Sequence, residues 1–339
     1  MKELAPNTLA TALRDFFSDY LPRLRGMSPH TILSYRDTFA LLLRFVAADK
    51  CRPVHLLNLD DIGPPEVLAF LDYLERKRLN TASTRNVRLA GIHAFFRYVS
   101  SQHPDQLECC QRVLGIPFKR SRSRQIEYLE FEEMDSVLSG IDRSSSHGRR
   151  DYVLLAVMFN TGARVQELLD LRARDLQLSK PFQVRLFGKG RKERFCPLWP
   201  QTARLVRRFC AEKQLDLQSD APIFLNYRGE PLTRFGVRHI LAKHLDRAKT
   251  TTPTLTKKKL HPHSVRHSTA VHLLKSGVDL CTISHWLGHA SINTTNKYAK
   301  VDLEMKRQAV ARARTIVSKG NRDVSWRRNA TVLQWLEAL

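Results

Sequence analysis

The chain has 339 residues, of which 42% are hydrophobic and 26% are charged, and its formal net charge at pH 7 is +23. This length allows two compact domains, and the composition excludes a disordered chain and a membrane-spanning one. So large a basic excess favours a polyanionic partner, because each phosphate that lysine or arginine neutralises releases condensed counterions. Nucleic acid is the leading partner on this ground, and a merely basic surface is the alternative.

Targeting and metal-binding signals are weak. Residues 1–7 lack the basic-then-apolar pattern of a secretion signal, so we expect a cytoplasmic protein without a membrane partner. None of the six cysteines forms a CxxC pair, which is typical of reduced packing residues. His263 and His267 are four residues apart and share a helix face, but no HExxH glutamate lies between them, and Arg266 would repel a cation. We therefore expect no metal and no cofactor.

The first part of the chain, residues 1–101, has the apolar spacing of four short amphipathic helices. Four such helices make a small bundle, which we take as one domain. Serine followed by proline marks the start of the second helix, since serine caps a helix and proline is tolerated in its first turn. The helices are expected to begin near Thr8, at Ser28, near Pro65 and near Ser83.

Residues 102–127 are expected to form a linker, because they lack apolar periodicity and contain a basic run. Such a linker either is a solvated loop or lies along a phosphate backbone, and the sequence favours neither. The candidate DNA contacts in this run are Lys119, Arg120, Arg122 and Arg124.

Residues 128–318 are predicted to be mainly helical with a small antiparallel sheet. A buried helix over 152–160 is broken at Thr161-Gly162, and two strands over 183–187 and 194–198 are joined by a glycine-flanked turn. A further short strand is expected to include Ile223 and Phe224. Other helices are expected over 165–171, 233–248, 264–276 and 281–287.

Seven polar residues lie at the ends of these elements and suit phosphoryl transfer. Guanidinium groups bind two phosphate oxygens at once, and a tyrosine hydroxyl is a workable nucleophile. A histidine assists proton transfer, and a lysine on a hairpin can protonate a departing oxygen. Each residue alone also has an ordinary interpretation as a surface, capping or packing residue. The seven are Arg164, Glu167, Lys189, His263, Arg266, His289 and Tyr298.

Taken together, the segments around these residues resemble the motifs of the tyrosine recombinase (phage integrase) family. The resemblance rests on TGARVQEL at 161–168, GKGRKER at 188–194, HSVRH at 263–267 and the segment LGHASINTTNKY at 287–298. Their order and separations are similar to the family's and span about 128–312. Val265 stands where the family more often has leucine, and we expect only packing consequences.

The resemblance implies a role for each motif residue. Tyr298 would form a 3′-phosphotyrosine and release a 5′-hydroxyl. Arg164 and Arg266 would hold the scissile phosphate, with His289 hydrogen-bonding to it. The supporting roles would be proton transfer by His263, protonation of the leaving oxygen by Lys189 (or by the nearby Lys192) and orientation of neighbours by Glu167.

The resemblance also implies the architecture and the partners. The N-terminal helices would form the family's core-binding (SAM-like) domain, clamping double-stranded DNA together with a mixed α/β catalytic domain. Arg85 and Arg88 would then contact the groove or phosphates. Residues 319–339 carry an apolar stripe at helical spacing that would pack on its own domain or on a neighbouring protomer of a homotetramer or an assembly with sister recombinases.

Two other functions share most of these features. A DNA-binding regulatory relative would keep the fold without exchanging strands, and the filled catalytic positions argue against it. A topoisomerase-like nicking-closing enzyme would share the phosphotyrosine chemistry, and the helical N-terminal domain argues against that. Among recombinases, integration, excision or transposition of a mobile element is the favoured role, while resolution of replicon dimers stays open. The sequence does not determine the DNA site.

Overall fold

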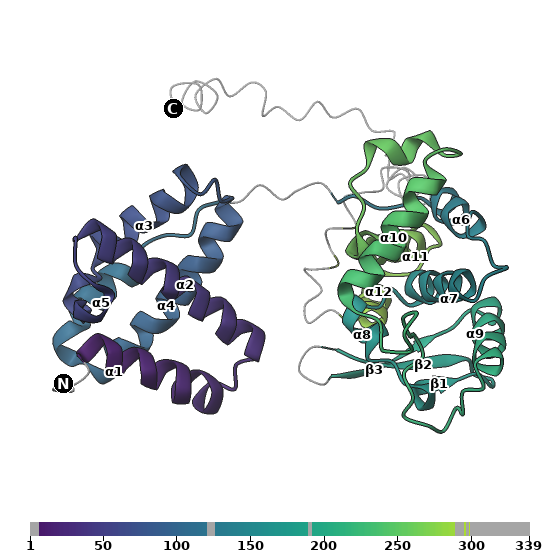
Figure 1. The fold of residues 1–339 in the computed structure, drawn as a ribbon, viewed down its shortest axis with the longest axis horizontal. Coiled ribbons are helices and arrows are strands. Elements are labelled where there is room, and N and C mark those ends of the chain that lie inside the picture. Colours follow the sequence, from purple (N-terminus) through teal and green to yellow (C-terminus); the bar gives the residue numbers. More distant parts are fainter. Residues whose placement is uncertain (1–6, 121–125, 189–191, 289–294, 296–297, 299–339) are drawn as a thin grey trace, which may run out of the picture. The chain divides into compact units, whose positions relative to one another are not determined.

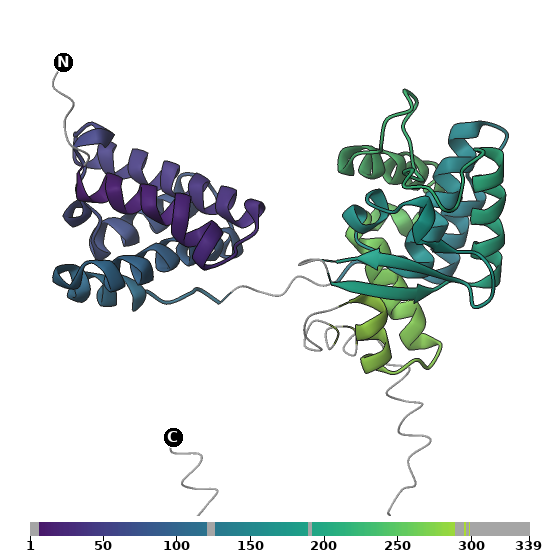
Figure 2. The same ribbon diagram turned by 90° about the horizontal axis from the view of Figure 1, so that it is seen from below.

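The computed structural model describes residues 7–120, 126–188, 192–288, 295 and 298. It divides into two compact units, Met1–Arg124 and Gln125–Leu339, which are drawn in Figures 1 and 2. Each unit has its own hydrophobic core, so each is described by itself. The prediction of a mainly helical protein with a small antiparallel sheet is confirmed.

The N-terminal unit is entirely helical within its described residues. The predicted helix starts near Thr8 and at Ser28 are confirmed, and the side-chain oxygens of Asn7 and Ser28 accept backbone N–H groups there. Its elements are α1 (Thr8–Asp15), the π-helix η1 (Phe16–Leu24), α2 (Pro29–Asp49), the 3₁₀ turns η2 (Val54–Leu56) and η3 (Leu59–Asp61), α3 (Pro64–Arg76), α4 (Ala82–Gln102), the 3₁₀ turn η4 (Pro104–Gln106) and α5 (Leu107–Leu114).

Aromatic rings hold these helices together. Phe16, Phe39 and Phe95 come from η1, α2 and α4, and all three are buried. Phe95 lies edge-on to Phe16 and to Phe39, with ring centroids 5.3 and 4.9 Å apart. Such geometry adds stabilisation beyond the burial of apolar area.

The helix α5 corrects one predicted boundary. Residues 102–127 were expected to be a linker, but α5 packs on α4 and buries Cys110 and Val113 in the core of the N-terminal unit. The His93 ring nitrogen Nε2 also contacts the Val113 carbonyl oxygen at 3.1 Å. The linker prediction is therefore wrong for its first half. The helix has only eight residues, which is too short to show a clear apolar periodicity in the sequence.

The second unit contains a three-stranded antiparallel sheet in the order β1-β2-β3, surrounded by helices. The helix α12, yellow-green in Figure 2, packs against β3, and α11 packs against α12 and α7. The strands are β1 (Leu176–Gln177), β2 (Gln183–Phe187) and β3 (Glu193–Pro197). The helices are α6 (Phe131–Ser139), α7 (Ser146–Thr161), α8 (Val165–Leu169), α9 (Pro200–Glu212), α10 (Arg234–Ala248), α11 (Pro262–Lys275) and α12 (Leu280–Leu287), with 3₁₀ turns η5 (Ala173–Asp175) and η7 (Pro253–Lys257).

The two longer predicted strands are confirmed, and the third strand lies elsewhere than expected. Ile223 and Phe224 are buried but belong to no strand, and only isolated bridges flank them. The third strand is β1, a two-residue strand that pairs Leu176 with Val184 of β2. A strand of two residues is too short to show the alternation of apolar and polar residues that predicts a strand from the sequence.

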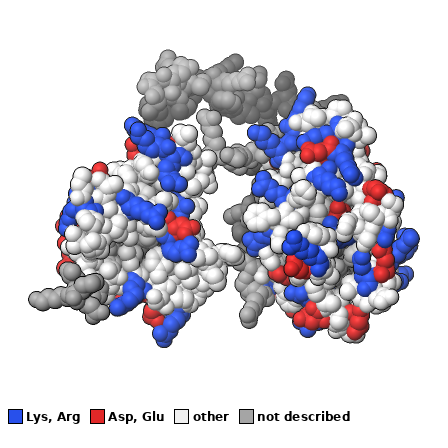
Figure 3. Space-filling view, in the orientation of Figure 1, with Lys and Arg blue, Asp and Glu red and all other residues white. Residues whose placement is uncertain are grey.

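Basic side chains are more prominent than acidic ones on the face of each unit seen in Figure 3. On the face shown in Figure 3, lysine and arginine cover more of each unit than acidic residues do, in keeping with the charge of +23. Among the helices described, none combines the length and hydropathy needed to cross a bilayer.

Gly162 is required where α7 ends. Its φ is +59°, a left-handed conformation that costs an L-residue roughly 1–2 kcal/mol. A Cβ atom at this position would lie 2.5 Å from Leu287 Cδ2 and 3.3 Å from Thr269 Cβ. The absence of a side chain at Gly162 therefore lets α12 and α11 pack against the end of α7.

We expect Gly162→Ala to lower the free energy of unfolding by about 2–4 kcal/mol, from backbone strain plus overpacking against Leu287. The matched control is Gly229→Ala, where φ is +79° but a Cβ would meet nothing within 4 Å, so only strain of about 1–2 kcal/mol applies. Denaturant unfolding of the full chain measures both. Equal losses would show that the contact with Leu287 does not matter.

Candidate active site

The first part of the site lies where α7 ends and α8 begins. Gly162 terminates α7, and Arg164 follows as the N-cap residue of α8 in an extended conformation. Glu167, in the first turn of α8, accepts the Arg164 backbone N–H at 2.8 Å and its guanidinium Nη1 at 2.7 Å. One carboxylate thus fixes both the backbone and the side chain of Arg164. The Arg164 side chain is still 38% exposed.

Arg266 lies in the first half of α11 and is 1% exposed. Its guanidinium Nη1 donates to the Gly162 carbonyl at 2.7 Å, and Nη2 donates to the Leu287 carbonyl. Burial and the nearby charge of Arg164 lower the pKa of Arg266 to about 10, so the group is still charged at neutral pH. The two arginines that the sequence assigned to the phosphate are therefore brought together.

A third arginine, Arg194, joins the site from β3 and was missed by the sequence analysis. Its Nη2 donates to Glu167 Oε2 at 2.7 Å, and its Nε donates to the Trp286 carbonyl at 3.0 Å. Burial raises the pKa of Glu167, but the hydrogen bond and charge of Arg194, together with the backbone and side-chain hydrogen bonds from Arg164, outweigh burial and hold this pKa below its ordinary value. The basic run at 189–194 gives no local signal that separates Arg194 from the other cations of the run.

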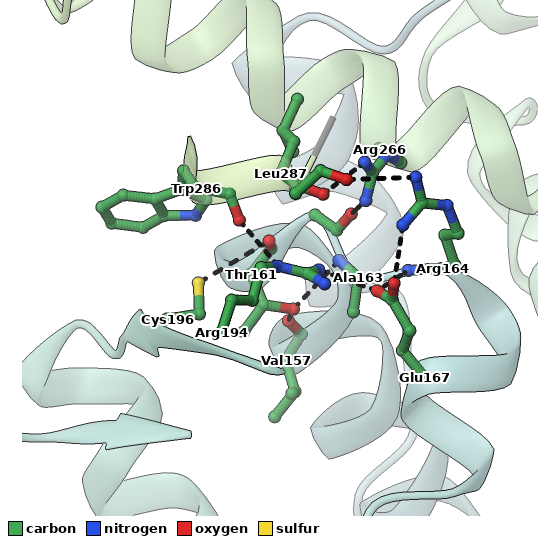
Figure 4. Close-up of polar contacts among 12 residues, drawn as sticks. Val157, Thr161, Ala163, Arg164, Glu167, Arg194, Cys196, Arg266, Trp286 and Leu287 are labelled. Carbon is green, nitrogen blue, oxygen red and sulfur yellow. Dashed lines mark hydrogen bonds and ion pairs between the residues drawn. The ribbon is translucent and has the colours of Figure 1, made fainter. Parts of the chain in front are cut away.

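The three arginines converge on the end of α12. The last carbonyls of a helix have no partner within it and carry partial negative charge. Here the Trp286 carbonyl binds Arg194, the Leu287 carbonyl binds Arg266, and the Gly288 carbonyl accepts Arg164 Nη2 at 3.4 Å (Figure 4). The end of α12 therefore positions all three guanidinium groups.

Tyr298 is fully buried, and its hydroxyl lies 2.7 Å from His267 Nδ1. Burial raises the pKa of Tyr298 to about 12, although the charge of Arg266 opposes the rise. His263, for which the family resemblance implies proton transfer, is exposed in the first turn of α11, and its ring centroid lies 4.6 Å from that of His267. His267, one helical turn further on, is thus in hydrogen-bond contact with Tyr298.

Other predicted site residues are only partly placed. Lys189 and His289 lie outside the described residues. Gly188, where the β2–β3 hairpin begins, donates its N–H to the Lys192 carbonyl at 2.7 Å, and Lys192 is exposed. Within the described part of the chain, no group of three metal-ligating side chains is arranged to hold an ion.

The candidate DNA contacts of the N-terminal unit differ in burial. Arg85 is 4% exposed and donates to the Pro117 carbonyl at 3.0 Å, so the structure gives it a packing role rather than a surface one. Arg88 is half-buried and donates to Ser34 and Thr38 of α2. Lys119 and Arg120 are exposed, and Lys119 pairs with Glu75. Arg122 and Arg124 lie outside the described residues.

Comparison with known proteins identifies the family to which the chain is similar. Residues 127–305 match the phage integrase family, and residues 14–103 match the phage integrase N-terminal SAM-like domain. The chain is 39% identical over 332 residues to the putative integrase/recombinase y4rC of Sinorhizobium fredii, covering 98% of each chain. It is 32% identical over 307 residues to the tyrosine recombinase XerC of Herpetosiphon aurantiacus, covering 89% of this chain and 95% of that one.

Solved structures share the fold. The XerH recombinase in a post-cleavage complex with a palindromic difH substrate aligns with a TM-score of 0.65 at 21% identity, covering 89% of this chain and 84% of that one. The Tn1549 transposon integrase in complex with a circular-intermediate DNA aligns with a TM-score of 0.66 at 15% identity, covering 88% and 98%.

The chain therefore belongs to the phage integrase family of tyrosine recombinases, the class that its fold and site define. It is an enzyme that breaks and rejoins DNA strands, and its partner is double-stranded DNA with a recombination site.

Proposed function

We propose that Tyr298 is the nucleophile of a site-specific recombination reaction in which Arg164 and Arg266 bind the scissile phosphate. The observation that carries this proposal is that two arginines meet at the end of α12, where Arg164 Nη2 donates to the Gly288 carbonyl and Arg266 Nη2 donates to the Leu287 carbonyl. The positive charge of Arg266 also opposes the rise that burial causes in the pKa of Tyr298, which is consistent with a tyrosine near these cations. Two guanidinium groups at a reacting phosphate stabilise the charge that develops on its oxygens.

The reaction transfers a phosphoryl group from the 5′ oxygen of the DNA to the tyrosine oxygen. The Tyr298 oxygen attacks phosphorus, the bond from phosphorus to the 5′ oxygen breaks, and a 3′-phosphotyrosine remains. Because the pKa of Tyr298 is about 12, its hydroxyl holds its proton at neutral pH and loses it during attack. The contact of 2.7 Å favours His267 as the group that receives this proton. Lys189 protonates the departing 5′ oxygen, and attack by another 5′-hydroxyl reverses the step.

The biological role proposed is integration, excision or transposition of a mobile element in the cytoplasm. Support comes from the relative named a putative integrase/recombinase, which matches at higher identity than the XerC relative compared above. A plasmid marker placed between the two boundary sequences of the DNA segment around its gene should be excised as a circle when the protein is supplied. Resolution of plasmid multimers without any excision would contradict this role.

The proposed assembly is a homotetramer, or an assembly with sister recombinases, on two DNA sites. Strand exchange needs two duplexes, each cut by protomers bound on both sides of the exchange point. The apolar stripe within residues 319–339, outside the described residues, is the candidate contact between neighbouring protomers.

We expect Tyr298→Phe to abolish cleavage and to leave DNA affinity nearly unchanged, because only the nucleophilic oxygen is lost. The substrate is a suicide duplex built on the sequence that the wild-type protein selects from randomised DNA. With excess chelator present, wild type should form a denaturant-resistant adduct that maps to Tyr298. An adduct at another residue, or cleavage that requires magnesium, would overturn the proposal.

We expect Lys189→Ala to slow cleavage by about 10²–10⁴-fold, as loss of a general acid does. A suicide duplex with sulfur in place of the 5′ bridging oxygen has a leaving group that needs no protonation, so it should restore most of the rate. The matched control is Lys192→Ala, on the same hairpin, which should cleave the ordinary duplex well. Rescue of Lys192→Ala rather than Lys189→Ala would move the general acid three residues along.

A further inference from the structure

The buried carboxylate of Glu167 has two cationic partners of different kinds. Arg194 reaches Oε2 at 2.7 Å and is 11% exposed, whereas Arg164 reaches Oε1 at 2.7 Å and is 38% exposed. Glu167 itself is 3% exposed. An ion pair strengthens as water is excluded from it, so Arg194 is the stronger counter-ion of this carboxylate and Arg164 is the one that can turn toward a ligand.

The fold fixes both the backbone of Arg194, on β3, and its guanidinium group, at the end of α12. Arg194 and Cys196 alternate on the inward face of β3, while Glu193 and Phe195 are exposed. Its guanidinium Nε is held by the Trp286 carbonyl. Gly288, at φ +63°, packs so closely that a Cβ there would lie 3.0 Å from Arg194 Cδ. The side chain therefore lies in a fitted channel between β3 and the end of α12.

Charge balance shows what this position does. With Glu167 alone, a single carboxylate would neutralise Arg164 and weaken its attraction for a phosphate. With Arg194 present, the site contains three guanidinium groups and one carboxylate. The sum of their unit charges is about two positive units, in a site proposed to bind a phosphodiester. That surplus matches the additional negative charge that develops on the phosphate oxygens during transfer.

We propose that Arg194 is a positioning residue that serves as the counter-ion of Glu167 and so leaves the charge of Arg164 for the scissile phosphate. This inference rests on the proposed function, because it concerns the same phosphate. Arg194 does not itself touch the reacting atoms. Its effect passes through Glu167, which holds the backbone and side chain of Arg164.

The first test removes the charge of Arg194. Arg194→Gln should cut the suicide duplex about 10- to 100-fold more slowly in single turnover, the usual loss on removing a group that orients a reacting residue. DNA affinity should stay within about threefold of wild type, since many other phosphate contacts set binding. Arg194→Lys, which keeps the charge, should be at least about tenfold faster than Arg194→Gln. Equal rates for the two variants would overturn the proposal.

The second test restores the balance by removing the carboxylate as well. The double variant Arg194→Gln/Glu167→Gln should cleave about tenfold faster than Arg194→Gln alone, because Arg164 is no longer neutralised. A merely structural ion pair predicts the opposite, since the second change would remove further contacts. A double variant as slow as Arg194→Gln, or slower, would therefore overturn the proposal.

A matched control separates charge balance from general damage to the sheet. Arg185 on β2 forms a similar pair with buried Asp175, its Nη2 lying 2.8 Å from Oδ1. Arg185→Gln should lower the thermal midpoint about as much as Arg194→Gln does, yet cleave at nearly the wild-type rate. If Arg185→Gln slows cleavage as strongly, the loss in Arg194→Gln reflects stability and the proposal fails.

The duplex with 5′ bridging sulfur tests whether the defect in Arg194→Gln lies at the leaving group. It should not rescue Arg194→Gln, because the defect lies at the phosphate-binding arginine and not at the leaving group. Rescue would show that Arg194 acts through the β2–β3 hairpin that carries Lys189, which overturns the inference. Failure of the proposed function is recognised separately, because wild type would then form no adduct at Tyr298.

Discussion

The site depends on the carbonyl groups that α12 leaves unbonded at its C-terminal end. Three consecutive carbonyls, from Trp286 to Gly288, each accept an arginine that comes from a different element. The helix end supplies partial negative charge that lets three cations approach one another without a carboxylate for each. The glycine that ends α7 allows this arrangement, because a side chain there would push α12 away.

Glu167 completes the arrangement, since three guanidinium groups alone would repel one another. Its two oxygens are shared between Arg164 and Arg194, and its backbone contact fixes the first turn of α8. A charge-assisted hydrogen bond of this kind is about twice as strong as a neutral one. The carboxylate therefore sets both the geometry of the arginines and the surplus of positive charge that the site carries.

The sequence predicted what depends on local patterns and missed what depends on tertiary contact. Arg164 and Arg266 stand in short motifs, and the structure brings them together as those motifs imply. Arg194 stands in a basic run of the sequence, and the packing of β3 against α12 is what distinguishes it. His267 was grouped with His263 on one helix face, but which of them meets Tyr298 depends on a segment far along the chain. The helix α5 was missed because two turns give too little periodicity.

Arg266 has a consequence for how substrate and fold are linked. Its guanidinium is almost completely removed from water, and its hydrogen-bond partners among the described residues are carbonyl oxygens. A buried cation without a full counter-charge lowers the stability of the empty protein. In the proposed function a bound phosphate supplies that counter-charge, and a ligand that binds only the folded state shifts the folding equilibrium toward it. On that proposal the protein without DNA is less stable than the protein with DNA bound, and the catalytic unit resists unfolding most strongly in the complex.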